Sequence, residues 1–136
     1  MTRQEAEALI ETYYHCFNEG DREGMIACLS PDVRHDVNEG QSRIGHEKFR
    51  EFMAHMDHCY EEKLTNITIM SHRDGKRLAA EFIVNGRYIA TDAGLPEAKG
   101  QIYVLPAGSF LEVENGKISR ITTYYNLQHW IALVGA

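Results

Sequence analysis

The chain has 136 residues, 43% of them hydrophobic, and 14 basic against 20 acidic residues give a formal net charge of −6. That length suits a single domain with its own core, and the negative charge argues against nucleic-acid or anionic-membrane partners, which require a basic surface. No apolar run is long enough to span a bilayer, and none follows Met1 as a signal region would. The three cysteines, Cys16, Cys28 and Cys59, have no framework spacing, which favours reduced thiols in a cytoplasmic protein.

Two helices are expected at the start of the chain. The segment from Thr2 to Glu5 has the form of a capping box, and apolar residues follow it at helical spacing, which predicts a helix over 3–18. Gly20 suits the position that ends this helix. Asp21 suits the N-cap of a second helix over 22–29, which Pro31 stops.

The next stretch combines a strand, a loop and a third helix. Residues 33–38 are typical of a short strand, and the polar, glycine-bounded residues 41–45 are interpreted as a loop. A helix over 46–58 is predicted because its apolar residues, among them Phe52 and Met56, fall on one face.

From Leu64 onward the hydrophobic period changes to two, which predicts strands. A strand over 64–70 is followed by a turn at 73–76 and a long strand over 78–91, in which Gly86 marks a bulge or a bend. A loop over 92–99 leads to extended runs at 100–105 and 109–113. The turn at Asn115-Gly116 then predicts a hairpin with a last strand over 118–126.

This order predicts the α+β class: a curved antiparallel sheet wrapped over three N-terminal helices, enclosing a conical cavity. The chain shows no internal repeat, linker or low-complexity segment, so residues 1–136 are expected to form one domain.

Three segments carry a resemblance to a known fold. They are Tyr13 to Asp21 at the end of the first helix, Leu29 to Val33, and the last hairpin with Asn115-Gly116-Lys117-Ile118 and Tyr124-Tyr125-Asn126. Together with the order of elements, they make nearly the whole chain resemble the nuclear transport factor 2 fold. Within that fold the chain looks most like the ketosteroid isomerase-like and SnoaL-like polyketide cyclase group. The resemblance implies a cone-shaped domain that often forms homodimers.

The resemblance also implies places for catalytic residues. Tyr13 falls where the isomerases keep an oxyanion-hole tyrosine. Their general-base aspartate corresponds to Val37, which lies between Asp36 and Asn38.

Two further places lie on the last hairpin. The second oxyanion donor of the isomerases corresponds to Gly108 or Ser109, depending on how the turn is aligned. The acid/base aspartate of the cyclases corresponds to Asn126.

His35 is the strongest candidate for proton transfer, because histidine titrates near neutral pH without a perturbing environment. Strand alternation places Val33, His35 and Val37 on one face and Asp36 on the other, unless a bulge turns Asp36 inward. His35 and Asp36 are therefore the two candidate proton carriers, and His35 is preferred. Tyr13 and Asn126 are expected to stabilise the enolate oxygen that forms.

The cavity is expected to bind an apolar ligand that carries a few oxygens, since polar aromatic and amide side chains are frequent on the strands. The predicted ligand-binding residues are Tyr88, Tyr103, Gln101, Phe52, Met56 and Phe110. No cofactor and no metal are expected: His55 has a helical spacing that suits metal binding to His58 and to Cys59, but the sequence places no third strong ligand beside such a pair.

Two functions remain open from the sequence. The first is an enzyme that uses acid–base catalysis for an isomerisation, dehydration or aldol-type cyclisation. The second is a non-catalytic module that binds a small molecule in the same pocket. A homodimer through the outer face of the sheet is also predicted, because the long strands carry apolar residues at both parities.

Overall fold

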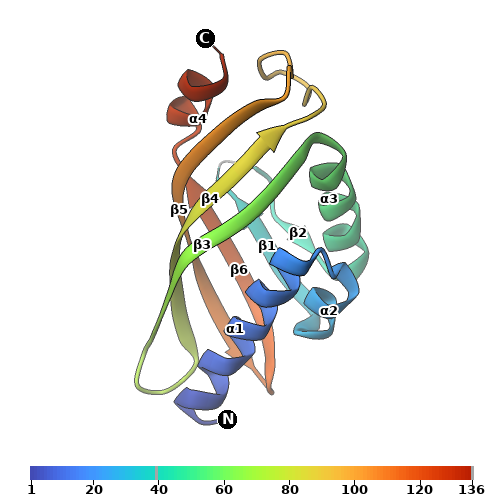
Figure 1. Ribbon diagram of the computed structural model, residues 1–136. Helices are drawn as coiled ribbons and strands as arrows, with labels where there is room; N and C mark the ends of the chain where they lie inside the picture. Colours follow the sequence, from blue (N-terminus) through green and yellow to red (C-terminus); the bar gives the residue numbers. More distant parts are fainter. Residues whose placement is uncertain (39, 136) are drawn as a thin grey trace.

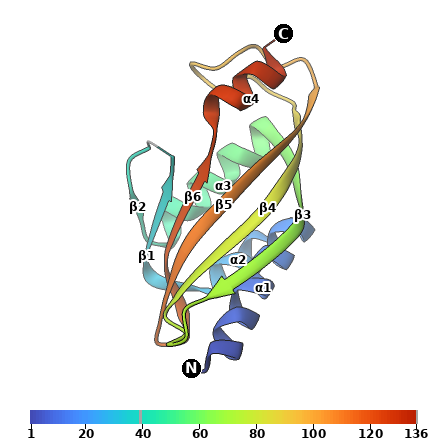
Figure 2. The same ribbon diagram turned by 90° about the vertical axis from the view of Figure 1, so that its left-hand side faces the viewer.

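The computed structural model describes residues 1–38 and 40–135, and its main feature is a curved sheet with three helices on its concave side (Figure 1). The helices and strands are α1 (Arg3–Glu19), α2 (Arg22–Ala27), β1 (Leu29–Val37), β2 (Arg43–Ile44), α3 (His46–Cys59), β3 (Tyr60–Ser71), β4 (Arg77–Tyr88), β5 (Gln101–Glu114), β6 (Lys117–Tyr125) and α4 (Leu127–Val134). When the molecule is viewed with the outer face of the sheet toward the reader, α1, α2 and α3 lie behind the strands (Figure 2).

The strand order in the sheet is β2-β1-β6-β5-β4-β3. The expected α+β architecture is confirmed, with one difference in strand direction. β1 pairs with β6 in parallel, so the sheet is mixed rather than wholly antiparallel. Hairpins join β3 to β4 and β5 to β6, whereas β1 comes from the other end of the chain and is free to join β6 in either direction.

α1 begins as its sequence predicts. The Thr2 hydroxyl accepts from the backbone N–H of Glu5, and the Glu5 carboxylate accepts from the backbone N–H of Thr2. The helix ends at Gly20, whose φ of 73° suits a residue without a Cβ. α2 is two residues shorter than predicted, because Leu29 already pairs with Ile118 of β6.

Three further details differ from the sequence-based expectation. The predicted loop over 41–45 contains β2, which pairs antiparallel with β1 and brings Arg43 opposite His35. β4 ends at Tyr88 rather than at residue 91, and it passes Gly86 without a register shift. The helix α4 was not predicted; Asn126 begins it by accepting a hydrogen bond from the backbone N–H of His129.

A single cluster of buried apolar side chains connects the helices to the concave face of the sheet. Among its fully buried members are Ile10 of α1, Phe49 of α3, Leu111 of β5 and Ile121 of β6. Among the described residues, no helix is both long and apolar enough to cross a membrane.

Candidate active site

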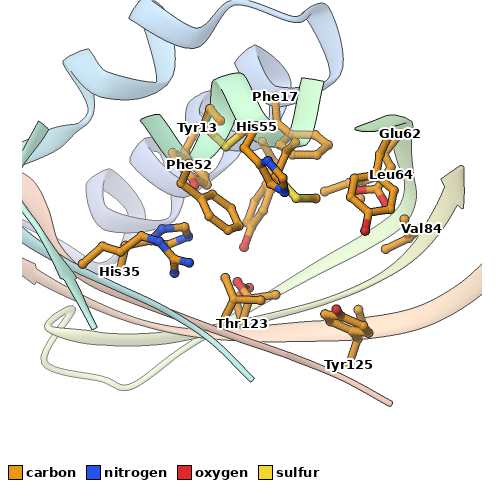
Figure 3. A pocket seen from close by; sticks show the side chains of 18 of the residues that line it. Tyr13, Phe17, His35, Phe52, His55, Glu62, Leu64, Val84, Thr123 and Tyr125 are labelled. Atoms are coloured by element: carbon orange, nitrogen blue, oxygen red, sulfur yellow. Dashed lines mark hydrogen bonds between the residues drawn. The ribbon is translucent and has the colours of Figure 1, made fainter. Parts of the chain in front are cut away.

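A cavity of about 840 Å³ lies between the helices and the concave face of the sheet. Its walls come from α1, β1, β2, α3 and the four long strands, with Trp130 of α4 at one end. Figure 3 shows His35 on one side and Glu62 on the other, with Thr123 of β6 between them. A cavity of this size, mostly apolar but with a few polar groups, is the usual form of a small-molecule site.

The imidazole of His35 lies on the cavity wall and is 4% exposed. Its ring packs against Phe49 and Phe52 of α3, with ring centroids 5.1 and 4.8 Å away. Nδ1 is buried without a hydrogen-bond partner among the described residues. Burial and, to a smaller extent, the nearby Arg43 guanidinium lower the pKa of His35 to about 4, against a smaller opposing effect of Asp36. The ring is therefore neutral at pH 7.

Arg43 lies beside His35 because the two residues are paired across β1 and β2. Its guanidinium carbon is 4.4 Å from the centroid of the Phe52 ring, a cation–π contact that fixes the group at the cavity wall. Nη1 is buried and has no acceptor among the described residues. A positive charge is thus held at the cavity with hydrogen-bonding capacity to spare.

Two tyrosines of α1 also border the cavity. Tyr13 and Tyr14 are both buried, and their rings meet edge to face at 5.1 Å. Burial raises the pKa of both phenols, that of Tyr14 to about 12, so each hydroxyl remains a hydrogen-bond donor at neutral pH. Tyr14 is buried against Phe82 of β4.

Glu62 of β3 places a carboxyl group at the side of the cavity opposite His35 (Figure 3). Glu62, Gly86 and Tyr103 are neighbours in register across β3, β4 and β5. A Cβ on Gly86 would lie 2.2 Å from the Tyr103 ring, so only glycine lets this ring cross β4. The Tyr103 hydroxyl then donates to Glu62 Oε2. Burial raises the pKa of Glu62 more than this hydrogen bond lowers it.

A second polar group borders the cavity where α3 meets the loop after β4. Asp92 accepts from the Tyr60 hydroxyl at 2.7 Å and contacts Nε2 of His55 at 2.9 Å. Its carboxylate, His55 and the Cys59 thiol bring their ligand atoms within 4.8 Å of one another. Asp92 thus supplies the third possible metal ligand, which helical spacing alone did not place. Its carboxylate is, however, already engaged in the contacts with Tyr60 and His55.

Asp36 points away from the cavity, as strand alternation predicts in the absence of a bulge. Its carboxylate accepts hydrogen bonds from Ser42, Thr122 and Arg34. Burial raises the pKa of Asp36, but these three hydrogen bonds outweigh it and leave the pKa below its ordinary value. Asp36 therefore stabilises the junction of β1, β2 and β6, and it does not line the cavity.

Of the other predicted site residues, Phe52 and Met56 line the cavity, as expected. Tyr88, Tyr103 and Gln101 do not: Tyr88 is fully buried and donates to the carbonyl of Pro96, and Gln101 donates to the carbonyl of Val134. The last two predicted site residues lie on the outer side of the molecule: Asn126 caps α4, and Phe110 is 50% exposed.

The sequence-based reasoning missed the cavity residues Arg43, Glu62, Thr123 and Tyr125. Strand parity could have found the last two, because they alternate with the exposed Tyr124. Arg43 could not have been found in this way, since β2 has only two residues and no period. Glu62 precedes the first predicted residue of its strand, so its parity was not considered.

Comparisons with known proteins agree with the fold. Residues 10–121 match the SnoaL-like domain model, and the chain belongs to this family. A candidate polyketide cyclase from Silicibacter sp. TM1040 is 54% identical, with a TM-score of 0.96 over 100% of this chain and 99% of that one. Similar candidates come from Pseudomonas putida KT2440 (49%, TM-score 0.93, 98% of each chain) and Xanthomonas campestris pv. campestris (47%, TM-score 0.94, 96% of this chain and 97% of that one). No curated protein matches the sequence.

Proposed function

We propose that this protein is a small-molecule enzyme that uses acid–base catalysis on an apolar, oxygenated substrate inside the cavity. The observation that carries the proposal is His35: a buried, neutral imidazole on the cavity wall, whose Nδ1 forms no hydrogen bond with residues 1–38 or 40–135. A buried polar atom left unpaired costs about 1–3 kcal/mol, so a group of this kind points to a role beyond folding.

The reaction class follows from the groups that border the cavity. Isomerisation, dehydration and aldol-type cyclisation all begin with removal of a proton from a carbon beside a carbonyl group. His35, unprotonated at neutral pH, is the proposed base, and the Tyr13 hydroxyl is the proposed donor to the enolate oxygen that forms. The candidate polyketide cyclases with 47–54% identity support this class of chemistry.

Glu62 offers a competing assignment of the base. Its carboxyl lies across the cavity from His35 and has a raised pKa, which suits proton abstraction. His35 is preferred because Glu62 already accepts a hydrogen bond from Tyr103, which holds its carboxylate against the wall.

Hydrogen–deuterium exchange tests the proposal without knowledge of the natural substrate. Two probes are suitable: butyrophenone, which is neutral, and benzoylpropionate, its carboxylate counterpart. Each is incubated with the protein in deuterium oxide, and exchange beside the ketone is followed by nuclear magnetic resonance. The wild type should accelerate the exchange of at least one probe, and His35→Ala should not. Loss of exchange in Glu62→Gln with full exchange in His35→Ala would assign the base to Glu62.

The second candidate function is a binding module without turnover. It is favoured because Val37 and Asn126 stand where the resembled enzymes keep their catalytic aspartates, and the neighbouring carboxylate of Asp36 points away from the cavity. Saturable binding of both probes with no exchange above the buffer rate would support this function and contradict the catalytic one.

We further propose that the protein is a cytoplasmic homodimer. The outer face of the sheet exposes Ile102, Val104, Phe110 and Tyr124 by 50–70%, and large apolar side chains exposed on one face favour a contact with a second subunit. Burial of all three thiols in the reduced state agrees with a reducing compartment. Light scattering should give the mass of a dimer, and Ile102→Lys should give a monomer. A monomeric wild type at micromolar concentration would refute the dimer, and recovery outside the cytoplasm on cell fractionation would refute the location.

A further inference from the structure

The cation at Arg43 is the feature of the cavity that the proposed chemistry leaves unused. The guanidinium borders the cavity, is held over the Phe52 ring, and forms no ion pair with any described residue. Buried charges in proteins are normally paired, because desolvation of a charge is costly. Because Nη1 of Arg43 has no acceptor within the described part of the chain, the guanidinium is arranged for an acceptor that arrives with a ligand.

We propose that Arg43 binds a carboxylate of the substrate beside His35, so that the substrates of this protein are apolar organic acids rather than neutral ketones. The inference rests on the proposed function, in that it takes the cavity as the substrate site. Guanidinium groups match carboxylates well, since both are planar and two parallel hydrogen bonds can form. The remaining wall, including Phe17, Leu64 and Val84, suits the apolar part of such an acid (Figure 3).

The pairing of Arg43 with His35 makes this arrangement productive. In the free protein, burial and, to a smaller extent, the Arg43 guanidinium oppose protonation of the imidazole, and the pKa of His35 is about 4. The groups that face this ring are Arg43 from β2 and Phe49 and Phe52 from α3, while Asp36 acts from the other face of β1. A carboxylate on Arg43 neutralises the opposing charge, and His35 then becomes a stronger base. An acidic substrate would thus activate the base that acts on it.

A neighbouring arginine shows why Arg43 differs from an ordinary surface cation. Arg34 also lies on the β1–β2 hairpin, but it points outward and donates to Asp36 at 3.0 Å. Its charge is neutralised and its side chain is 58% exposed. Among the described residues, the hairpin therefore carries an arginine outside that is paired with a carboxylate and an arginine at the cavity whose Nη1 has no acceptor.

Two fluorescent probes with nearly the same aromatic frame test the proposal. Anilinonaphthalene sulfonate carries an anion, and N-phenylnaphthylamine does not. Arg43→Met keeps an apolar stem of similar length but removes the charge. Loss of one charge-assisted hydrogen bond is worth about 1.5–3 kcal/mol, so Arg43→Met should weaken sulfonate binding roughly 10–150-fold. Binding of the neutral probe should change by less than about twofold.

Two control variants keep the result specific to this cavity. Arg87→Met removes an equal charge from an exposed position of β4 and should leave both affinities unchanged. Ala107→Trp fills the cavity and should weaken the binding of both probes. Equal affinity of Arg43→Met and the wild type for the sulfonate would overturn the proposal, and so would an equal loss for both probes. Both results leave the exchange experiment with butyrophenone intact, so failure of the acid subsite is distinguishable from failure of the proposed enzyme.

Discussion

Substitution of His35 by leucine should leave the fold as stable as the wild type or make it more stable. The ring makes apolar contacts with Phe49 and Phe52, which a leucine of similar size can replace. Nδ1 is buried and has no partner in the part of the chain that the structure describes, and removal of such an atom recovers about 1–3 kcal/mol. We expect a net gain of about 1–2 kcal/mol in the free energy of unfolding at pH 7, after allowance for imperfect packing.

The same variant should remove a pH dependence of stability. The pKa of His35 is about 4 when folded against 6.5 ordinarily, so the unfolded chain binds this proton more readily. The contribution of neutral His35 to the free energy of unfolding is therefore fully present above pH 6.5. It is lost as the pH falls toward 4, by roughly 3 kcal/mol in total. His35→Leu should lack this part of the decline.

Urea unfolding at several pH values, followed by circular dichroism, measures both effects. Val33→Ala is the matched control, because Val33 is a fully buried inward residue of the same strand. It should lose roughly 1–3 kcal/mol at every pH, as a cavity-forming substitution does. A loss of more than 2 kcal/mol in His35→Leu at pH 7 would show that the imidazole is a structural, hydrogen-bonded group, and the functional reading of His35 would fail.

The remaining predictions concern turnover, the far wall of the cavity and metal ions. Once a substrate is found, His35→Ala should lower kcat roughly 10²–10⁴-fold, and Tyr13→Phe roughly 10²–10³-fold, in steady-state assays of variants that remain folded by circular dichroism. Full activity of His35→Ala would refute the assignment. Gly86→Ala should cost about 1–3 kcal/mol in urea unfolding, because its Cβ would overlap the Tyr103 ring, and should raise the pKa of Glu62 in a carbon-13 titration by removing its donor. An unchanged Glu62 titration would mean that Tyr103 does not act on this carboxyl. Chelators should leave the melting temperature unchanged, since hydrogen bonds already hold the carboxylate of the three-donor cluster; a fall on chelation would show a structural metal ion.

Much of the fold could be predicted because local signals and tertiary structure agree in this chain. The capping box at Thr2, the glycine at position 20 and the Asn115-Gly116 turn each determine a backbone conformation within a few residues. Strand β2 and helix α4 could not be predicted in this way. Two residues of β2 are too few to show a period, and they are extended only because β1 offers them hydrogen bonds.

The candidate site was predictable where the period of a single helix or strand decides direction. Helical spacing placed Phe52 and Met56 on one face of α3, and both line the cavity. Along β1 the rule is strand alternation. The rule placed His35 inward and Asp36 outward, as the structure shows. Alternation did not suffice for Tyr103. Its side chain is on the inner face, but it extends across β4 at Gly86 to reach Glu62 on β3 rather than entering the cavity. Arg43 depends on cross-strand register, and sequence alone does not supply the register of a two-residue strand.

The most direct test of the account is a crystal structure of the protein with benzoylpropionate bound. The account predicts the ligand inside the cavity, with its ketone oxygen within hydrogen-bonding distance of the Tyr13 hydroxyl, the adjacent carbon beside His35 and its carboxylate on Arg43. A ligand bound instead at the outer face of the sheet beside Phe110, with the cavity filled by repacked side chains, would contradict it.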